Sequence, residues 1–344
     1  MMFPNFNSLI LAILFLTFSS AQINLYSTPF IDSSTSQFGR RIEGASVNAN
    51  GDMFATNFGA NLFAIGSITP SQSVYHTSSS PNSFYNSIRF IPLTKTQVYQ
   101  GVQGVALLAN VKENQITKIV VDKDGYVEQS AICMDQTLSL PNDLSYSYET
   151  NRIYISGQNI TANTVKGDGG LWVCDGKSGI VIDHVSFGRT NGIEISPDEN
   201  TLYISETLNK DSKVVSNKIW RFNIDKSTGK VSNQELFVDF EILDGTQAID
   251  IDGMKTDIDG NLYVTRHDGS HVSVFDPLGN LLSKIYLSSI KKPTNLEFGG
   301  DYGKTLFIVG ACIDDGTKGC VETILSDVPG RAFTALKSLN GKLI

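Results

Sequence analysis

Residues 252–265 read DGMKTDIDGNLYVT: a polar residue before a glycine, a short β-forming run, an Asp-Gly turn and a second β-forming run. Two more β-rich runs follow at residues 272–275 and 281–287, separated by turns that contain Asp, Gly, Asn or Pro. Short β-forming runs joined by such turns are typical of an antiparallel meander. Helical periodicity is nearly absent along the rest of the chain, so the sequence predicts an all-β protein.

The same phrase, a polar residue followed by two β-forming runs with a turn between them, recurs along the chain. The gaps between successive copies are 44, 55, 49, 61 and 43 residues. A period of about 40 to 50 residues with four strands per repeat is typical of propeller blades. We therefore expect an all-β, six-bladed β-propeller of four-stranded antiparallel blades, rather than two packed sandwiches, which would not repeat one phrase. The copies start near Glu43, Ser87, Asn142, Asn191, Asp252 and Asn295.

The six repeats account for nearly all of residues 23–344, so we expect one propeller domain without a linker. A strand from one end of the chain should complete the ring, because such pairing hides a terminal sheet edge. The candidates for this strand are Asn24–Tyr26 and Ala332–Thr334.

Composition limits the possible partners. The chain has 344 residues, of which 41% are hydrophobic, enough for a large buried core. Its formal net charge is −8 and its pI is about 5.0, which argues against nucleic acid or an anionic membrane as a partner. The acidity is compatible with a cation site, although mild acidity also keeps many proteins in solution.

The first 22 residues differ from the rest. An apolar run at residues 9–16 precedes the small residues Ser19, Ser20 and Ala21, and it is too short to span a bilayer well. No Lys or Arg precedes the run, but we still expect residues 1–22 to be a cleaved signal peptide and the mature protein to be secreted, without a membrane partner. The sequon that begins at Asn159 predicts N-glycosylation there.

Four cysteines occur in the chain. Cys312 and Cys320 flank a polar, turn-rich loop, and in an exported chain we expect them to form a disulfide. Zinc is the alternative, but no second Cys or His pair has ligand spacing. Cys133 and Cys174 are open to either pairing or burial as thiols.

The repeat also predicts a site. In a propeller the innermost strand of each blade lines the central channel, so Glu43, Asn142, Asn191 and Asp252 should face one another. Each of these residues taken alone could simply belong to a turn. Four of them at the same position of the repeat favour a ring of side chains around the channel instead. Two carboxylates and two amides that converge without a cation would be unfavourable. Such oxygen ligands suit calcium, with magnesium or manganese as alternatives.

The ends of the second strands should return to the same face. They carry Asn57, Gln158, Glu206 and the pair Arg266-His267. Glu206 is a candidate ligand or substrate contact, or simply a solvated strand end. His267 is a candidate acid or base in contact with substrate, or a surface residue beside an Asp-Gly turn. No nucleophile elbow, zinc-protease motif or phosphate loop occurs in the sequence.

Several of these phrases resemble the regucalcin (senescence marker protein)/gluconolactonase family over about residues 40–310. This resemblance implies a six-bladed propeller with one divalent cation, either calcium or zinc among relatives. It implies Glu43, Asn191 and Asp252 as metal ligands, Asn142 as a neighbouring ligand or substrate contact, and Asp252 as the general base of lactone or ester hydrolysis. The phrases are residues 190–198, 141–143, 252–254 and 293–300.

Two positions depart from the family pattern. Leu140 stands where sugar-lactone members carry an Arg that contacts substrate, and Ala45 stands where the first blade usually has Pro. The resemblance therefore implies a more apolar substrate than a sugar-acid lactone.

The sequence leads to one main functional hypothesis, a secreted, divalent-metal-dependent hydrolase that acts as a monomer on a small-molecule lactone or ester. A non-catalytic calcium- or ligand-binding propeller is the second hypothesis. A propeller isomerase or condensing enzyme of the strictosidine-synthase type is the third, and such enzymes lack a full metal site of this kind.

Overall fold

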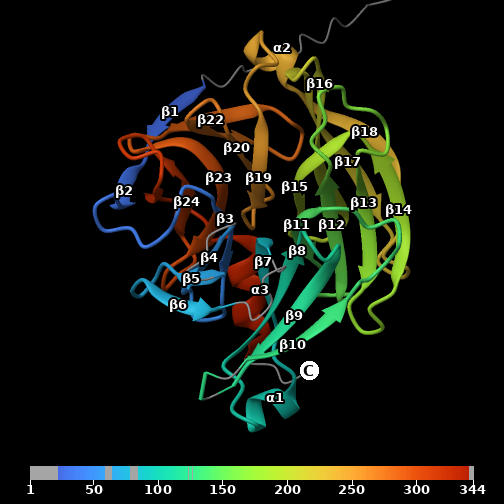
Figure 1. Cartoon of the computed structure of the whole chain (residues 1–344), viewed down its shortest axis with the longest axis vertical. Coiled ribbons are helices and arrows are strands. Elements are labelled where there is room, and N and C mark those ends of the chain that lie inside the picture. The colour runs from blue at the N-terminus through green and yellow to red at the C-terminus, as the bar shows by residue number, and fades with distance from the viewer. Residues whose placement is uncertain (1–21, 59–63, 78–83, 123, 126, 341–344) are drawn as a thin grey trace, which may run out of the picture.

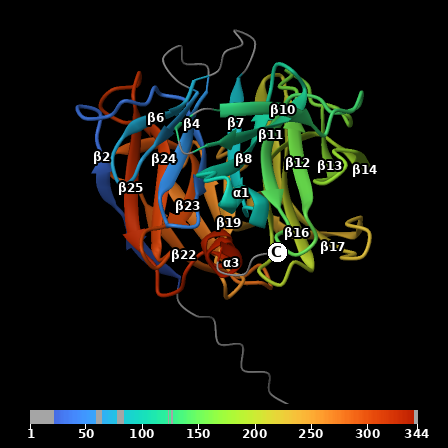
Figure 2. The ribbon, with the colours of Figure 1, turned by 90° about the horizontal axis from the view of Figure 1, so that it is seen from below.

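Six antiparallel sheets surround a central channel in the computed structural model of the chain (Figures 1 and 2). In each sheet the strands follow one another outward from the channel, as the blades of a propeller do. The predicted six-bladed, all-β architecture is therefore confirmed. The structure describes residues 22–58, 64–77, 84–122, 124–125 and 127–340, so the expected signal peptide lies almost wholly outside the described residues.

The two inner strands of each blade carry most of the buried surface. The innermost strands are β3 (Ile42–Val47), β7 (Tyr85–Ile91), β11 (Pro141–Tyr146), β15 (Arg189–Ile195), β19 (Ile251–Thr256) and β23 (Ile290–Gly299). The second strands are β4 (Met53–Asn57), β8 (Gly104–Asn110), β12 (Arg152–Gln158), β16 (Thr201–Lys210), β20 (Leu262–Arg266) and β24 (Thr305–Cys312). Apolar side chains of these strands fill the space between neighbouring blades.

The outer strands are more exposed. The third strands are β5 (Ile65–Ser67), β9 (Gln115–Val121), β13 (Gly169–Asp175), β17 (Lys213–Ile224), β21 (His271–Phe275) and β25 (Gly319–Leu325). The fourth strands are β6 (Ser73–His76), β10 (Val127–Ile132), β14 (Val181–Phe187), β18 (Val231–Asp239), β22 (Leu281–Tyr286) and β2 (Thr28–Ile31). Two short helices, α1 (Lys95–Tyr99) and α2 (Phe240–Asp244), lie in connections between strands.

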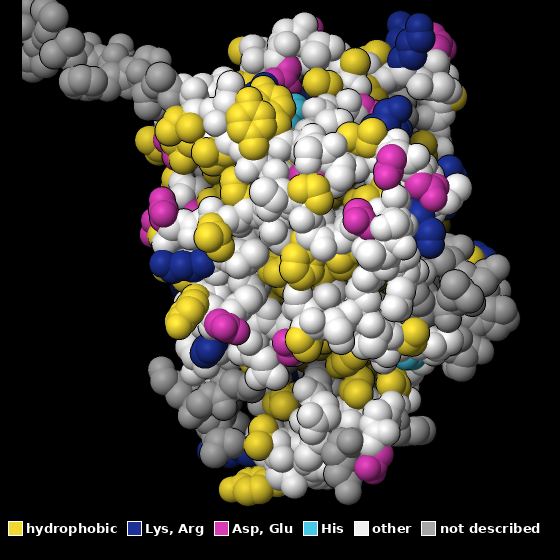
Figure 3. All heavy atoms as spheres, turned by 90° about the vertical axis from the view of Figure 1, so that its left-hand side faces the viewer, with side chains coloured by type: hydrophobic (Ala, Val, Ile, Leu, Met, Phe, Trp, Pro, Cys, Tyr) yellow, Lys and Arg dark blue, Asp and Glu magenta, His cyan; other side chains and the backbone are white. Residues whose placement is uncertain are grey.

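The N-terminal segment closes the ring, but not with the strand expected from the sequence. Strand β2 pairs antiparallel with β25 and completes the sixth blade. The expected strand at Asn24–Tyr26 forms as part of β1 (Ile23–Tyr26), yet it pairs in parallel with β22 as a fifth strand of the fifth blade. On the side of the molecule that carries β1 and β2, hydrophobic side chains are scattered over the surface among acidic and basic ones (Figure 3).

The alternative closing strand at Ala332–Thr334 is wrong, because these residues belong to helix α3 (Arg331–Asn340). Ala332, Phe333 and Leu336 are buried in the core of the first blade, and their spacing places them on one face of a helix. Figure 1 shows α3 in the middle of the ring. Among the described residues, no helix is long and apolar enough to cross a membrane.

Two disulfides tie the outer parts of the sheets. Cys312–Cys320 joins β24 to β25 as the sequence predicts, and this pairing excludes the alternative of a zinc site on the two thiolates. Cys133–Cys174 resolves the pair left open by the sequence, since it links the segment after β10 to β13 of the next blade. The two disulfides fit an extracellular protein.

Candidate metal centre

The first residues of the innermost strands meet at one end of the channel. Glu43, Asn142, Asn191 and Asp252, the four residues expected to form a ring, all line one cavity of about 630 Å³. In each of these four strands the pairing with the next strand shifts register near the site residue. A β-bulge of this kind re-aims a side chain, and here the re-aimed side chains reach a common space.

Glycines let the strands approach one another beside the site. A Cβ added at Gly44, whose φ is +49°, would lie 2.4 Å from Ser87 Cα on the next blade. A Cβ added at Gly192 would lie 2.3 Å from the carbonyl oxygen of Asp252. The glycine that follows the polar residue in these repeats is therefore explained by packing as well as by turn formation. Only glycine allows the neighbouring strand to come this close.

The two carboxylates of the site are held in unfavourable surroundings for negative charge. Burial, and then the charge of Asp143, raise the pKa of Glu43 to about 8, and Arg41 offsets only part of this rise. Burial, and then Glu43 and Asp250, raise the pKa of Asp252 well above its ordinary value, although the amide of Asn191 acts in the opposite direction. Glu43 thus opposes the ionisation of Asp252, and Asp143 opposes that of Glu43.

This donor set fits a divalent cation. Among the described residues, neither Glu43 nor Asp252 forms an ion pair with a Lys, Arg or His side chain. Two carboxylates and the amide oxygens of Asn191 and Asn142 are hard ligands of the kind that Ca²⁺, Mg²⁺ and Mn²⁺ prefer. A cation bound among them would stabilise the ionised forms of both carboxyl groups, which burial and neighbouring carboxylates disfavour.

A second ring of residues surrounds the mouth of the cavity. It contains Arg189, the first residue of β15, and Asp250, which directly precedes β19. Each stands two residues before a site residue, and Arg189 Nη2 lies 2.5 Å from Asp250 Oδ2. Apolar walls come from Phe58, Leu140 and Ile160. The cavity therefore combines a polar floor with partly apolar sides, an arrangement that suits a small organic molecule.

The structure brings one of the two other expected substrate contacts to the cavity. His267 lines it, and its Nδ1 lies 3.2 Å from the carboxylate of Asp268. Glu206 is not among the lining residues. Its two carboxylate oxygens instead accept hydrogen bonds from the backbone N–H of Gly188 and from Trp220 Nε1, at 2.8 and 2.9 Å.

Several lining residues were not expected from the sequence, and three of them lie beside the ring. Asn86 occupies in the second blade the position that Asn142 holds in the third, and the weak repeat near Ser87 was the available signal. Arg189 and Asp250 precede Asn191 and Asp252 by two residues. Their shared spacing was a second signal, because alternate residues of a strand point to the same side.

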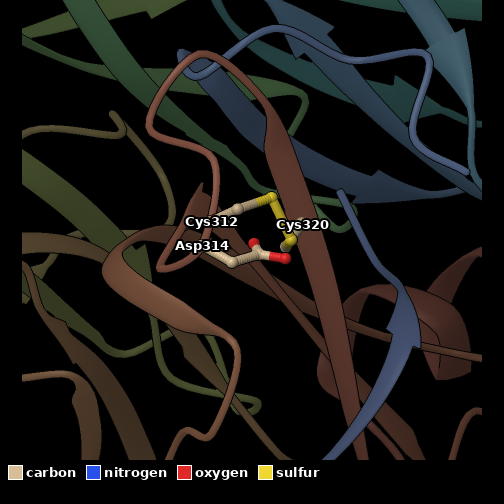
Figure 4. Close-up of side chains that lie close together, drawn as sticks. All are labelled: Cys312, Asp314 and Cys320. Carbon is tan, nitrogen blue, oxygen red and sulfur yellow. A yellow bond between two sulfur atoms is a disulfide. The ribbon is translucent and has the colours of Figure 1, made fainter. Parts of the chain in front are cut away.

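A nearby group of potential ligands is not a metal centre. Cys312, Asp314 and Cys320 lie close together (Figure 4). The two sulfur atoms form a disulfide, so neither is a thiolate, and Asp314 accepts a hydrogen bond from Ser33 at 2.7 Å. Cys312 also lines the cavity, so this disulfide fixes one part of the cavity wall.

Below the site the channel is filled by paired charges. Arg89 Nη1 lies 2.8 Å from Glu297, and Arg331 of α3 lies 2.6 Å from Glu194. Lys255 Nζ lies 3.6 Å from Asp143. All of these side chains are almost fully buried, so paired charges occupy the channel beneath the candidate metal centre.

Fold and site together define a six-bladed propeller with a candidate divalent-cation centre at one end of its channel. A family model described as SMP-30/Gluconolactonase/LRE-like region matches residues 82–311, well over half of the chain. The chain therefore belongs to this family, and the resemblance expected from the sequence is confirmed.

Curated relatives and solved structures agree with this assignment. The chain is 27% identical to a gluconolactonase of Zymomonas mobilis over 56% of the chain and 55% of that protein, so it spans about half of that relative's length. It is 26% identical to the pentonolactonase XacC of Haloferax volcanii over 70% of the chain and 76% of that protein. The structure of a calcium-binding protein, regucalcin, from Agrobacterium tumefaciens is similar in fold, with a TM-score of 0.65, 16% identity, and coverage of 90% of this chain and 97% of that one.

Proposed function

We propose that the protein is a secreted, divalent-metal-dependent hydrolase of lactones or related esters. The observation that carries this proposal is the convergence of Glu43, Asn191 and Asp252 at the end of the channel, where the leading electrostatic influences on Asp252 are other carboxylates. The names of the Zymomonas and Haloferax relatives, a gluconolactonase and a pentonolactonase, support the reaction class. The name of the Agrobacterium structure supports calcium as the cation.

Each part of the site has a role in this reaction. A divalent cation at Glu43, Asn191 and Asp252 would supply a Lewis acid for the ester carbonyl and would acidify water. Asp252 acts as the general base: as the water oxygen attacks the carbonyl carbon, Asp252 takes the water proton, the ring C–O bond breaks, and the proton passes to the alkoxide that leaves. Asn142 and Asn86 donate side-chain N–H groups that orient the substrate, and Leu140 contacts its apolar part.

His267 is proposed as a second substrate contact. It lines the cavity and faces Asp268, so it is placed to donate a proton at the mouth. Glu206 is left out of the proposal, because both of its carboxylate oxygens already accept hydrogen bonds outside the cavity.

The test measures metal content and turnover in the same preparation. The purified mature chain should contain about one divalent cation per molecule, should hydrolyse members of a panel of aliphatic and sugar lactones, and should lose this activity with a chelator. Asp252→Asn should reduce kcat by at least about a hundredfold. Glu235→Gln is the matched control, since Glu235 is exposed on β18 and pairs with Arg221.

A second candidate function is a non-catalytic cation- or ligand-binding propeller, which the same donor set favours. Bound cation without turnover of any lactone, together with an unchanged Asp252→Asn variant, would favour this second function over hydrolysis. Absence of any bound cation would contradict both. Export is tested separately, by an N-terminus at residue 23 in the secreted protein and by a mass shift at Asn159 on removal of N-glycans.

A further inference from the structure

Cations gather at the mouth of the cavity although the protein as a whole is acidic. Arg40, Arg41, Arg189, Lys291 and Lys292 all line the cavity, whereas the whole chain has a formal net charge of −8. The negative charge of the cavity comes from Glu43, Asp252 and Asp250, and the first two are the proposed ligands of the cation.

Only two of these five cations are neutralised by neighbouring carboxylates. Arg189 pairs with Asp250, and Lys292 pairs with Asp268 at 2.9 Å. Among the described residues, no carboxylate forms an ion pair with the remaining three, which are Arg40, Arg41 and Lys291. With a divalent cation on Glu43 and Asp252, the mouth of the cavity would therefore be positively charged.

Arg189 is the most buried of the five cationic residues, and its guanidinium has hydrogen-bond donors that are not used. The residue is only 8% exposed, and among the described residues its side chain donates one hydrogen bond, from Nη2 to Asp250. Its Nε is buried without a partner. Asp250 is itself fixed, since its other oxygen accepts from Thr207 and from the backbone N–H of Ile251 at 2.9 Å. A buried guanidinium that is held in place with unused donors is costly unless a ligand or water completes it.

We propose that the substrate carries a negatively charged group, and that Arg189 binds this group while Arg41, Arg40 and Lys291 attract it to the mouth. The inference rests on the proposed function and names the substrate class for the same site. Arg189 precedes the site residue Asn191 by two residues on β15 and lines the same cavity, so a substrate that reaches both must carry its anionic group apart from its reacting carbonyl. A lactone or ester with a carboxylate on a short side chain, rather than directly on the ring, meets this requirement.

Arg189 is thus a specificity-determining residue on the wall where the fourth blade meets the fifth. Leu140 keeps the wall of the third blade apolar. The resulting cavity would accept a molecule with one anionic end and an apolar middle. A neutral sugar lactone would offer no anionic group to the remaining donors of Arg189 and would bind Leu140 poorly.

The test compares two probes that differ only in charge: a γ-lactone with a terminal carboxylate on a short alkyl side chain, and the carboxamide of the same lactone. For the metal-loaded wild-type protein, kcat/KM should be at least about tenfold higher for the carboxylate, the factor that one charge-assisted hydrogen bond supplies. Raising the salt concentration should lower this ratio, because Arg40, Arg41 and Lys291 are accessible to counterions.

Variants locate the effect. Arg189→Met should bring the ratio of the two kcat/KM values close to one, and Arg189→Lys should give an intermediate ratio, because lysine keeps the charge but not the planar fork. Arg41→Met, at an exposed position, should lower the ratio even if Arg189→Met fails to fold. Arg221→Met, on the outer part of the same blade, is the matched control and should leave the ratio unchanged.

The result that overturns the proposal is a wild-type protein that processes the carboxamide as well as the carboxylate, or an Arg189→Met variant that keeps the preference. If neither probe is hydrolysed, the proposed hydrolase function fails on its own. Calorimetric titration of the metal-loaded protein with the two probes then decides the inference, since the same tenfold preference is expected in Kd. Equal Kd values would overturn it.

Discussion

Glu43 should make cation binding depend steeply on pH. Without a cation, burial and Asp143 raise its pKa to about 8, and Asp252 is shifted in the same direction. At pH 7 a carboxyl group with this pKa is protonated in roughly nine molecules out of ten. A cation binds the ionised forms, so we expect the release of about one to two protons per cation at pH 7.

The same shift predicts how the stability of the metal-free protein varies with pH. The folded-state pKa of Glu43 lies above the ordinary value of 4.5, so its contribution to stability is fully present below pH 4.5. This contribution is lost as the pH rises through about 8. The interval corresponds to at most about 5 kcal/mol, an upper limit because the side chain keeps some exposure to the cavity.

Glu43→Gln separates the two effects. Glutamine has the shape of the protonated acid and cannot ionise, so at pH 8 the metal-free variant should unfold at a higher temperature than the metal-free wild type. With saturating Ca²⁺ the order should reverse, because the variant has lost a charged ligand. Two stability curves that cross in this way are not expected from a residue that only fills space.

The assay is calorimetric titration of the metal-free protein with CaCl₂ in two buffers of different ionisation enthalpy, at several pH values between 5.5 and 8. The difference between the buffers gives the number of protons released. Affinity should rise about tenfold per pH unit for each proton released. Cation binding with no proton release and with a constant Kd over this range would refute the reasoning.

Three other perturbations have predictable sizes. Replacing both members of Cys133–Cys174, which are 41 residues apart, by Ala should lower the free energy of unfolding by about 4 kcal/mol. The same change at Cys312–Cys320, with its separation of 8, should lower it by about 2.5 kcal/mol, because the closed loop is shorter. Urea denaturation measures both values, and the reverse order would contradict the loop-entropy reasoning. Glu297→Gln should cost about 3 to 5 kcal/mol in the same assay, because it removes the nearest carboxylate of the buried Arg89, whose other ion-pair partner, Asp143, is 3.7 Å away. A cost below about 1 kcal/mol would contradict this. Gly192→Ala should weaken Ca²⁺ binding at least about tenfold, because its Cβ would displace the Asp252 backbone; unchanged calorimetric affinity would show that β15 and β19 can separate without disturbing the site.

The ring of site residues could be predicted because it depends on one periodic property. Each repeat begins with a polar residue at the start of an innermost strand, and the propeller brings these starts together whatever the loops do. The sequence therefore placed Glu43, Asn142, Asn191 and Asp252 at one cavity. The bulges and the glycine contacts that aim these side chains were not predictable, because they depend on which strand lies next to which.

Features that depend on pairing between distant segments were predicted less well. Strand β2 closes the ring in place of β1, and both are short β-forming runs that the sequence does not distinguish. Glu206 lies within β16 rather than at the strand end that the sequence predicted, and its carboxylate accepts a hydrogen bond from the indole of Trp220 on the adjacent strand, outside the cavity. Arg189 stands two residues before Asn191 in the fourth blade, as Leu140 stands two residues before Asn142 in the third. The family resemblance points to the position in the third blade alone, so Arg189 was not predicted.

The channel contains two glutamates whose pKa values are shifted in opposite directions. Burial alone would raise the pKa of Glu194, but Arg331 and Arg89 hold it at about 2, whereas the pKa of Glu43 is raised to about 8. Two buried arginines thus stabilise the ionised form of Glu194 in the channel, and one of them, Arg331, comes from α3. At the cavity end the same fold supplies none to Glu43 or Asp252. Since packing and electrostatics are satisfied a few residues further along the same strands, the missing charge at the cavity end is best explained by a cation that arrives from solution.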